Sequence, residues 1–199
     1  MARSRAYLFG AVAGLLIACG CSDPLARSTD PELARAVGRP QQSYGGVPRV
    51  SPTTHADIGS MILCSESPEP LRITSVSAVG TTGKITVVDV RTRSNPFLEK
   101  PVQKAVGVSY GSLASAGMTA DSRTILPCRS SNPAAGSEVA LELSVPSGTN
   151  SATRGWRFTV TDGQHTSTVT YPLGVVLCST PTMKEPACAA LWKSYAEPS

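Results

Sequence analysis

The chain has 199 residues, 41% of them hydrophobic and 16% charged, and its 18 Lys and Arg residues against 14 Asp and Glu leave a net charge of +4. This length suits one domain of ordinary size with a real hydrophobic core. The basic residues are scattered along the chain, whereas nucleic-acid-binding domains cluster Lys and Arg on one face. No nucleic-acid partner is therefore expected.

The first 18 residues are typical of a signal peptide. Arg3 and Arg5 form a cationic start, and residues 6–18 are an uncharged apolar run broken only by two glycines. The run is too short to span a membrane, because a transmembrane helix needs about 20 apolar residues. The sequence therefore predicts export, with residues 1–18 as the leader.

The end of the leader, residues 16–19, reads Leu-Ile-Ala-Cys and resembles the bacterial lipobox. The resemblance implies lipidation of Cys19, and so a protein anchored by lipid to the outer face of the cytoplasmic membrane. An ordinary signal peptide is the alternative, but no A-x-A-like cleavage site stands in the appropriate place. Cys21 fits the lipobox less well, because Ala18 would then occupy the leucine position.

Residues 19–59 are predicted to form a flexible tether. Prolines interrupt this segment repeatedly, and it shows no apolar periodicity. A coil of about 40 residues spans roughly 35 Å on average. The folded domain is therefore expected at residues 60–199, held away from the membrane surface.

From residue 61 onward, apolar and polar residues alternate in short runs that are separated by turn residues. The pattern predicts seven strands, at residues 71–79, 84–92, 104–110, 122–126, 138–145, 156–161 and 165–177. The apolar phase changes within the first two strands, which indicates a β-bulge in each. Short strands without intervening helices predict an all-β fold, namely an antiparallel immunoglobulin-like β-sandwich.

The last two strands are expected to form a hairpin. Its turn is assigned to residues 162 and 163, an Asp-Gly pair that suits a two-residue type I′ loop. Trp156 then faces Val169, and a one-residue slip would mix the apolar and polar faces. The predicted core face carries Trp156, Phe158, Val160, Val169 and Tyr171.

The tail after the last strand contains one organised segment. Pro186 can open a short C-terminal helix, because proline is tolerated at the first helical position. One apolar stripe follows at helical spacing, comprising Cys188, Leu191, Trp192 and Tyr195.

Four cysteines lie in or beside the predicted domain: Cys64, Cys128, Cys178 and Cys188. In an oxidising compartment they predict two disulfides. Structural zinc is the alternative, but the nearest pair, Cys178 and Cys188, is ten residues apart, wider than the usual zinc spacing. In a seven-strand sandwich, Cys64 before the first strand and Cys128 after the fourth lie at one end, which favours the pairs Cys64–Cys128 and Cys178–Cys188.

The domain also resembles a family of small exported proteins from high-GC Gram-positive bacteria. The resemblance covers about residues 64–178 and depends on four short segments, residues 93–96, 138–143, 155–160 and 172–178, which read RSNP, EVALEL, GWRFTV and PLGVVLC. It implies a β-sandwich with disulfides, and it brings no catalytic residue with it.

Catalytic, metal and cofactor motifs are not found in the sequence. Of the two histidines, His55 falls in the predicted tether and His165 beside the hairpin turn, where a solvated surface residue is expected. The serine-rich residues 111–117 lack the first glycine of a G-x-S-x-G motif. The methionines and histidines show no close spacing typical of a copper site. We therefore expect no cofactor, no metal and no enzymatic activity.

One loop is a candidate binding site. Residues 93–103 follow the second predicted strand and carry Arg93, Asn95, Phe97 and Leu98. Exposed apolar side chains on a rigid scaffold often mark recognition sites. The alternative is that Phe97 folds back and covers the open end of the sandwich.

Two classes of function stay open at this point. The first is a lipid-anchored binding or structural module of the cell envelope, with an envelope protein or a wall polymer as its partner. The second is a small extracytoplasmic hydrolase whose active site the motifs do not reveal. Convergent polar groups around a base in a pocket would favour the hydrolase.

Overall fold

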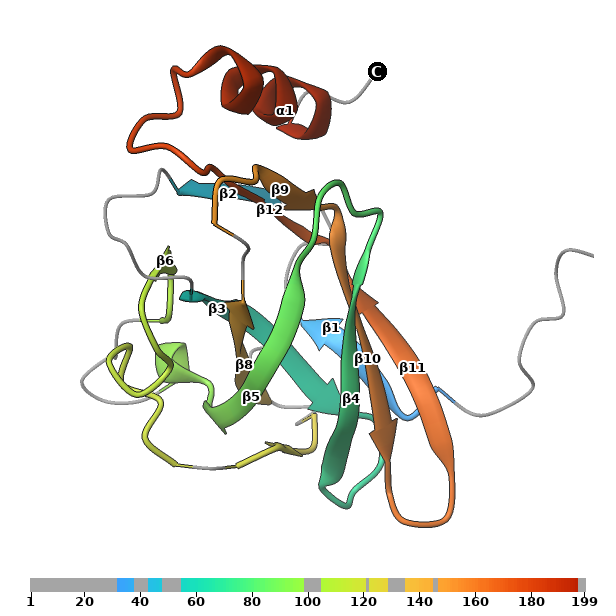
Figure 1. The fold of residues 1–199 in the computed structure, drawn as a ribbon. Helices are drawn as coiled ribbons and strands as arrows, with labels where there is room; N and C mark the ends of the chain where they lie inside the picture. The colour runs from blue at the N-terminus through green and yellow to red at the C-terminus, as the bar shows by residue number, and fades with distance from the viewer. Residues whose placement is uncertain are drawn as a thin grey trace, which may run out of the picture.

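The computed structural model describes residues 32–37, 43–47, 55–98, 105–120, 122–128, 135–144 and 147–196. The leader, Cys19 and Cys21 lie outside these ranges, so lipidation stays a prediction. Within the described residues the fold is all-β, as expected, with one short α-helix (Figure 1).

The largest sheet has five strands and is built around β3 (His55–Ser65). One edge of β3 pairs with β8 (Ser137–Ser144), which in turn pairs with β5 (Thr86–Ser94). The other edge is shared by β1 (Ala34–Val37) and β6 (Val108–Tyr110). β3 is buried on both faces along most of its length.

A second sheet has four strands in the order β11-β10-β4-β7. These are β11 (Thr166–Tyr171), β10 (Gly155–Thr161), β4 (Leu71–Val79) and β7 (Thr124–Ile125). The two sheets pack face to face, because side chains from both form one apolar core. Its largest fully buried members include Trp156, Phe158, Ile58, Met61, Leu63 and Leu141.

A third, three-stranded sheet joins a strand from the early part of the described chain to two strands from its later part. β12 (Leu173–Leu177) pairs with β9 (Ser151–Thr153) on one side and, in parallel, with β2 (Ser43–Val47) on the other. The helix α1 (Pro186–Ala196) covers this sheet (Figure 1). A second apolar cluster fills the interface, comprising Ala152, Val176, Cys178, Cys188 and Tyr195.

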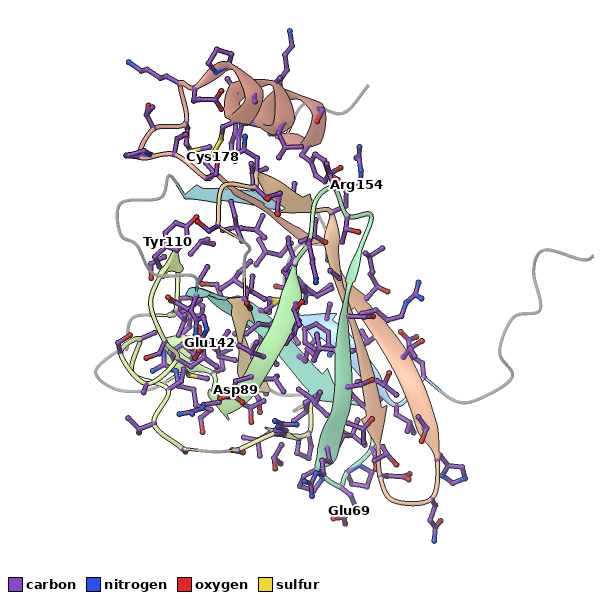
Figure 2. All side chains as sticks on the ribbon, viewed as in Figure 1. Glu69, Asp89, Tyr110, Glu142, Arg154 and Cys178 are labelled. Atoms are coloured by element: carbon purple, nitrogen blue, oxygen red, sulfur yellow. A yellow bond between two sulfur atoms is a disulfide. The ribbon has the colours of Figure 1, made fainter. Side chains whose placement is uncertain are left out.

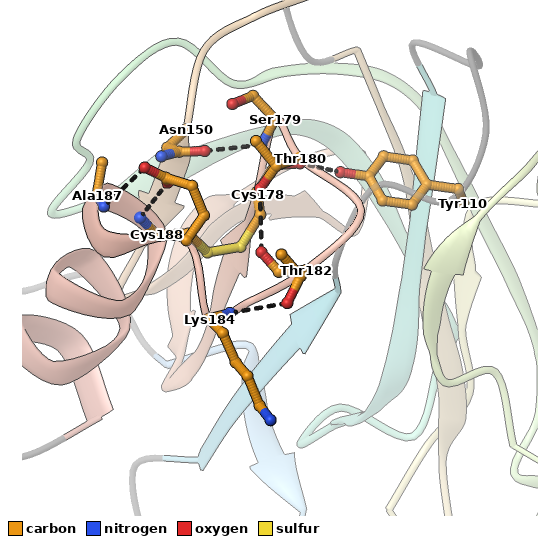
Figure 3. The surroundings of a disulfide bond; sticks show 10 residues. Tyr110, Asn150, Cys178, Ser179, Thr180, Thr182, Lys184, Ala187 and Cys188 are labelled. Carbon is orange, nitrogen blue, oxygen red and sulfur yellow. Dashed lines mark hydrogen bonds between the residues drawn. A yellow bond between two sulfur atoms is a disulfide. The ribbon is translucent and has the colours of Figure 1, made fainter.

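The C-terminal helix confirms the predicted stripe and is capped at its start. Cys188 and Tyr195 are buried, and Leu191 and Trp192 pack against the same cluster. The carboxylate of Glu185 accepts the backbone amides of residues 187 and 188 at 3.1 and 2.9 Å, which lowers its pKa (Figure 3). A capping carboxylate satisfies amides that lack partners in the first turn.

The predicted number of strands is wrong, because the described residues contain twelve strands in three sheets. Each of the seven predicted segments does contain a strand. The segment at 165–177 is two strands, β11 and β12, which belong to different sheets. Pro172 separates them, since it has no amide hydrogen to donate to a ladder. β9 is only three residues long, too short to show a period.

The predicted tether at 19–59 is also too long. β1, β2 and the first residues of β3 lie within it and pair with distant parts of the domain. The sequences of β1 and β2, ARAV and SYGGV, show little alternation. They are strands because β3 and β12 supply hydrogen-bonding edges, a long-range effect that a local pattern does not contain.

The hairpin register differs from the prediction by two residues. Trp156 faces Tyr171 rather than Val169, and the loop between Thr161 and Thr166 has four residues. The carboxylate of Asp162 accepts the backbone amides of residues 164 and 165 at 2.8 and 2.7 Å, which stabilises the longer loop. A shift of two residues preserves the faces, so the predicted core face is confirmed: Trp156, Phe158, Val160 and Val169 are buried and Tyr171 is half-buried.

Both predicted bulges are confirmed. In β4 the register against β10 shifts between Ile73 and Ser75, and in β5 the register against β8 shifts between Val87 and Asp89. The extra residue in β5 is Val88, which is 47% exposed. A bulge changes which side chains point inward, and this explains the change of apolar phase in the sequence.

The predicted disulfide pairing is confirmed, although its geometry differs from the one expected. Cys64 bonds to Cys128 and Cys178 to Cys188, with Cα–Cα distances of 4.9 and 5.6 Å. Cys64 lies inside β3, not before the first strand. Cys128 meets it because the amide of Cys128 donates to the carbonyl of Ser65 at 2.7 Å. In the loop-entropy model, bonds with these sequence separations stabilise by about 4 and about 3 kcal/mol respectively.

Trp156 is fully buried between the two large sheets, and its Nε1 has no hydrogen-bond partner among the described residues. Trp156→Ala is therefore expected to lower the free energy of unfolding by about 3–5 kcal/mol. Trp156→Phe keeps an aromatic ring and removes the unpartnered N–H, so it should cost much less. Urea unfolding monitored by circular dichroism measures both changes, and a loss below about 1 kcal/mol for Trp156→Ala would contradict the core assignment.

Candidate functional site

The predicted binding loop begins at the end of β5. Arg93 Nε donates to Glu138 Oε2 at 2.7 Å, and Asn95 is buried with its Oδ1 accepting the amide of Phe97 at 3.1 Å. These contacts give Arg93 and Asn95 roles in the fold. Phe97, in the 3-10 helix η1 (Pro96–Leu98), is 53% exposed, so it does not fold back as a cover. The side chain of Leu98 lies outside the described residues.

Glu138 is fully buried and serves as a structural anchor. Besides Arg93, it accepts the amides of Val106 and Ser60 at 2.7 and 3.1 Å through Oε1. Ser60 adopts a positive φ of 62° at the bulge of β3, and its hydroxyl donates to the carbonyl of Val106 at 2.7 Å. The carboxylate therefore attaches the loop at 105–107 to β3, and its hydrogen-bonding capacity is satisfied.

The best candidate for a binding site is a cleft where β7 lies beside β4. It has a volume of about 470 Å³ and is lined by Arg72, Ser122, Arg123 and Thr124. Arg72 and Thr124 are direct partners in the β4–β7 ladder, so both side chains stand on the outer face of the sheet. Smaller hollows of about 130 and 300 Å³ adjoin it, one toward β5 and the other toward the hairpin loop.

Asp89 of β5, labelled in Figure 2, lines the smaller hollow toward β5, which shares Arg123 with the cleft. Its Oδ2 accepts Arg91 Nε at 2.8 Å and its Oδ1 accepts the amide of Val90 at 2.8 Å. Arg123 reaches the same Oδ1 only at 3.6 Å. Arg91 is therefore the close ion-pair partner of Asp89, and the guanidinium group of Arg123, which lines the cleft, keeps donors that no described residue uses.

A second polar group lies on the face of β3 and β8 away from β4 and β10, and it adjoins Asp89, which faces Glu142 across the β5–β8 ladder (Figure 2). Asp57 and Glu142 face each other across the ladder. Both carboxylate oxygens of Asp57 lie 2.9 Å from Ser109 Oγ. Glu142 Oε1 is 2.7 Å from His55 Nδ1, and Oε2 accepts the amide of Leu113 at 3.1 Å. His55, predicted to lie in the tether, in fact opens β3.

This group has part of the geometry of a catalytic site. A carboxylate that holds a histidine, and is itself held by an amide, can orient that histidine as a base. Among the residues that the structure describes, however, no hydroxyl group bonds the other ring nitrogen of His55. Burial raises the pKa of Asp57, the charge of Glu142 raises it further, and the hydrogen bond from Ser109 opposes the shift.

The other histidine is the surface residue that the sequence predicts. The side chain of His165 is 58% exposed at the hairpin tip, 3.2 Å from Asp162 Oδ2. The backbone amides of His165 and Gln164 bond the carboxylate of Asp162 and lower its pKa to about 2. Asp162 therefore stabilises the turn as a carboxylate and is not available as a proton acceptor at neutral pH.

Neither a metal cluster nor a membrane-spanning helix is found in the described part of the chain. No three or more His, Cys, Asp or Glu side chains there come together as metal ligands. The one described α-helix is too short to cross a membrane.

Comparison with known proteins returned no match, whether against family models, curated proteins or solved structures. The cleft therefore has to be interpreted from its own residues. Sequence reasoning missed it because Arg72 and Thr124 are distant in the chain and meet only through the β4–β7 pairing. The one available signal is the polar triplet at 122–124 immediately before the buried Ile125.

Asp57→Asn is expected to leave the protein at least as stable as the natural chain at pH 7. The pKa of Asp57 is raised in the folded state above its usual value of 3.8, so ionisation of Asp57 opposes folding. The stabilisation linked to the protonated carboxyl is complete below about pH 3.8 and is lost as the pH rises through the folded pKa. Asparagine does not ionise and still accepts the hydrogen bond from Ser109.

Urea unfolding between about pH 3.5 and pH 8 measures this difference. Ser109→Ala is the matched control, because it removes the hydrogen bond and retains the charge. Ser109→Ala should increase the fall in the free energy of unfolding between low and high pH. Asp57→Asn should abolish that fall. The prediction is wrong if Asp57→Asn is destabilising at pH 7 and neutral at pH 4.

Proposed function

We propose that this protein is a lipid-anchored, non-catalytic binding module of the bacterial cell envelope, built on an immunoglobulin-like β-sandwich. The leader supports this location at the membrane surface, because residues 16–19 have the pattern of a lipobox. The two disulfides support it independently, since such bonds persist in oxidising compartments outside the cytoplasm. The anchor is Cys19, on the outer face of the cytoplasmic membrane.

The cleft at β7 is the observation that carries the binding role. Its lining supplies two guanidinium groups and two hydroxyl groups. Guanidinium groups stay protonated at every physiological pH, so they attract and orient a ligand but do not exchange protons with it. A site of this composition is suited to recognition and lacks the titratable base that acid–base catalysis needs.

A hydrolase is the alternative, and the contact between His55 and Glu142 favours it. The two functions differ in a direct test, in which the full mature chain is exposed to a fluorophosphonate probe and to a panel of ester and peptide substrates. We expect neither labelling nor turnover. Labelling that disappears in both His55→Ala and Glu142→Gln, with the variants still folded by circular dichroism, would establish the hydrolase instead.

The anchor is tested by mass spectrometry of the protein extracted from membranes. The mature N-terminus is expected at Cys19 with a diacylglycerol adduct. Cys19→Ala should leave the precursor unprocessed or release the domain from the membrane fraction, and Cys21→Ala is the matched control that should change neither. A mature N-terminus at another residue, without the added mass of a lipid, would refute the proposed lipid anchor.

A further inference from the structure

We propose that the cleft formed by Arg72, Ser122, Arg123 and Thr124 binds a phosphate monoester group or inorganic phosphate. This inference rests on the proposed binding role and names the chemistry of its ligand. It depends on three observations: backbone hydrogen bonds hold the cleft in place, several of its donors bond no described residue, and two arginines line it.

The cleft is fixed to both large sheets. The carbonyl of Ser122 accepts the amide of Thr92 in β5 at 2.7 Å, and the carbonyl of Arg123 accepts the amide of Ile73 in β4 at 2.9 Å. The segment at 122–124 is therefore held from two sides before any ligand arrives. A site organised in advance loses little conformational entropy on binding.

Several donors of the cleft are not used within the fold. Arg72 forms no ion pair with any described residue, and Arg123 has only the long contact to Asp89. Ser122 Oγ accepts from Thr92 Oγ1 at 3.1 Å and from the amide of Thr124 at 3.3 Å, so its own proton is left to donate. The hydroxyl of Thr124 bonds no described residue.

The charged groups and hydrogen-bond donors of the cleft suit a ligand with two negative charges. The cleft and its two extensions are lined by two arginines, at 72 and 123, and two carboxylates, Asp89 and Asp162. Arg91 pairs with Asp89, and Glu142, which faces Asp89 across the β5–β8 ladder, contacts His55. The oxygens of Asp162 are occupied by the turn. Two guanidinium forks with two hydroxyl donors exceed what one carboxylate needs. They match a phosphate monoester, which has three terminal oxygens and a charge of about −1.5 to −2.

The position of the cleft allows the phosphate to come from a lipid headgroup. The described chain enters the domain near the hairpin, where the amide of Leu33 donates to Ser167 Oγ at 3.3 Å. The cleft extends toward the same hairpin, at Thr161, Asp162 and Gly163. Thirteen residues separate Cys19 from Leu33, a distance of at most roughly 50 Å along an extended chain. A soluble phosphate ester would reach the same donors.

Titration calorimetry on the full mature chain, at fixed ionic strength, tests the site with inorganic phosphate, glycerol 3-phosphate, sulfate and acetate. Sedimentation with vesicles of phosphatidic acid in phosphatidylcholine, against phosphatidylcholine alone, tests the lipid source. Arg72→Gln and Arg123→Gln should each weaken binding about tenfold or more, because each removes charge-assisted hydrogen bonds. Arg157→Gln is the matched control, since Arg157 is exposed on the outer face of the same sheet and lines none of these hollows.

Binding of phosphate or its esters that falls in the two cleft variants, but changes less than about twofold in Arg157→Gln, supports the site. Binding in solution then identifies a soluble ester, and binding only to phosphatidic acid vesicles identifies a headgroup. No binding in either arm at millimolar concentration overturns the inference, as does equal binding of acetate and sulfate or equal weakening by all three variants. The lipidation and probe experiments are independent of these results, so failure of the phosphate site and failure of the proposed function can be distinguished.

Discussion

The central constraint on this fold is that β3 is buried on both faces, so every amide and carbonyl along it needs a partner. Three segments distant in sequence provide those partners: β8 on one edge, and β1 and β6 on the other. At the bulge, where the ladder to β8 is interrupted, the buried carboxylate of Glu138 accepts the amide of Ser60. The segment before residue 60 therefore cannot be removed from the domain without exposing the centre of its largest sheet.

The cleft arises where the two large sheets are connected at one end. β7 is only two residues long, yet its segment hydrogen-bonds β4 in one sheet and β5 in the other. Such a short strand leaves the edge of β4 incompletely covered, and polar side chains surround the resulting hollow. The bulge at Val88 acts in the same region, because the residues of β5 around it, including Asp89, line the adjoining hollow.

The buried and half-buried carboxylates outside the cleft have hydrogen-bond partners of their own. Glu138 is matched by Arg93, Glu142 contacts His55, and Asp57 is stabilised by a serine hydroxyl without a cation. Arg72 has no such partner among the described residues. An exposed arginine without an ion pair contributes little to stability, and the guanidinium groups of Arg72 and Arg123 line the same cleft, where a ligand can reach them.

The sequence alone determined the local features: the all-β class, the face of β10 and β11 that enters the core, both bulges, the short C-terminal helix and the disulfide pairs. The strands, bulges and helix follow from the alternation and helical spacing of neighbouring residues. The disulfide pairs follow from the positions of four cysteines, which allow few pairings. Only the tertiary structure decided that β1, β2 and β9 are strands, that Trp156 faces Tyr171, and that Arg72 and Arg123 line one cleft. These features depend on hydrogen-bonding edges and turn contacts supplied by distant or irregular segments, and no local period encodes which segments will meet.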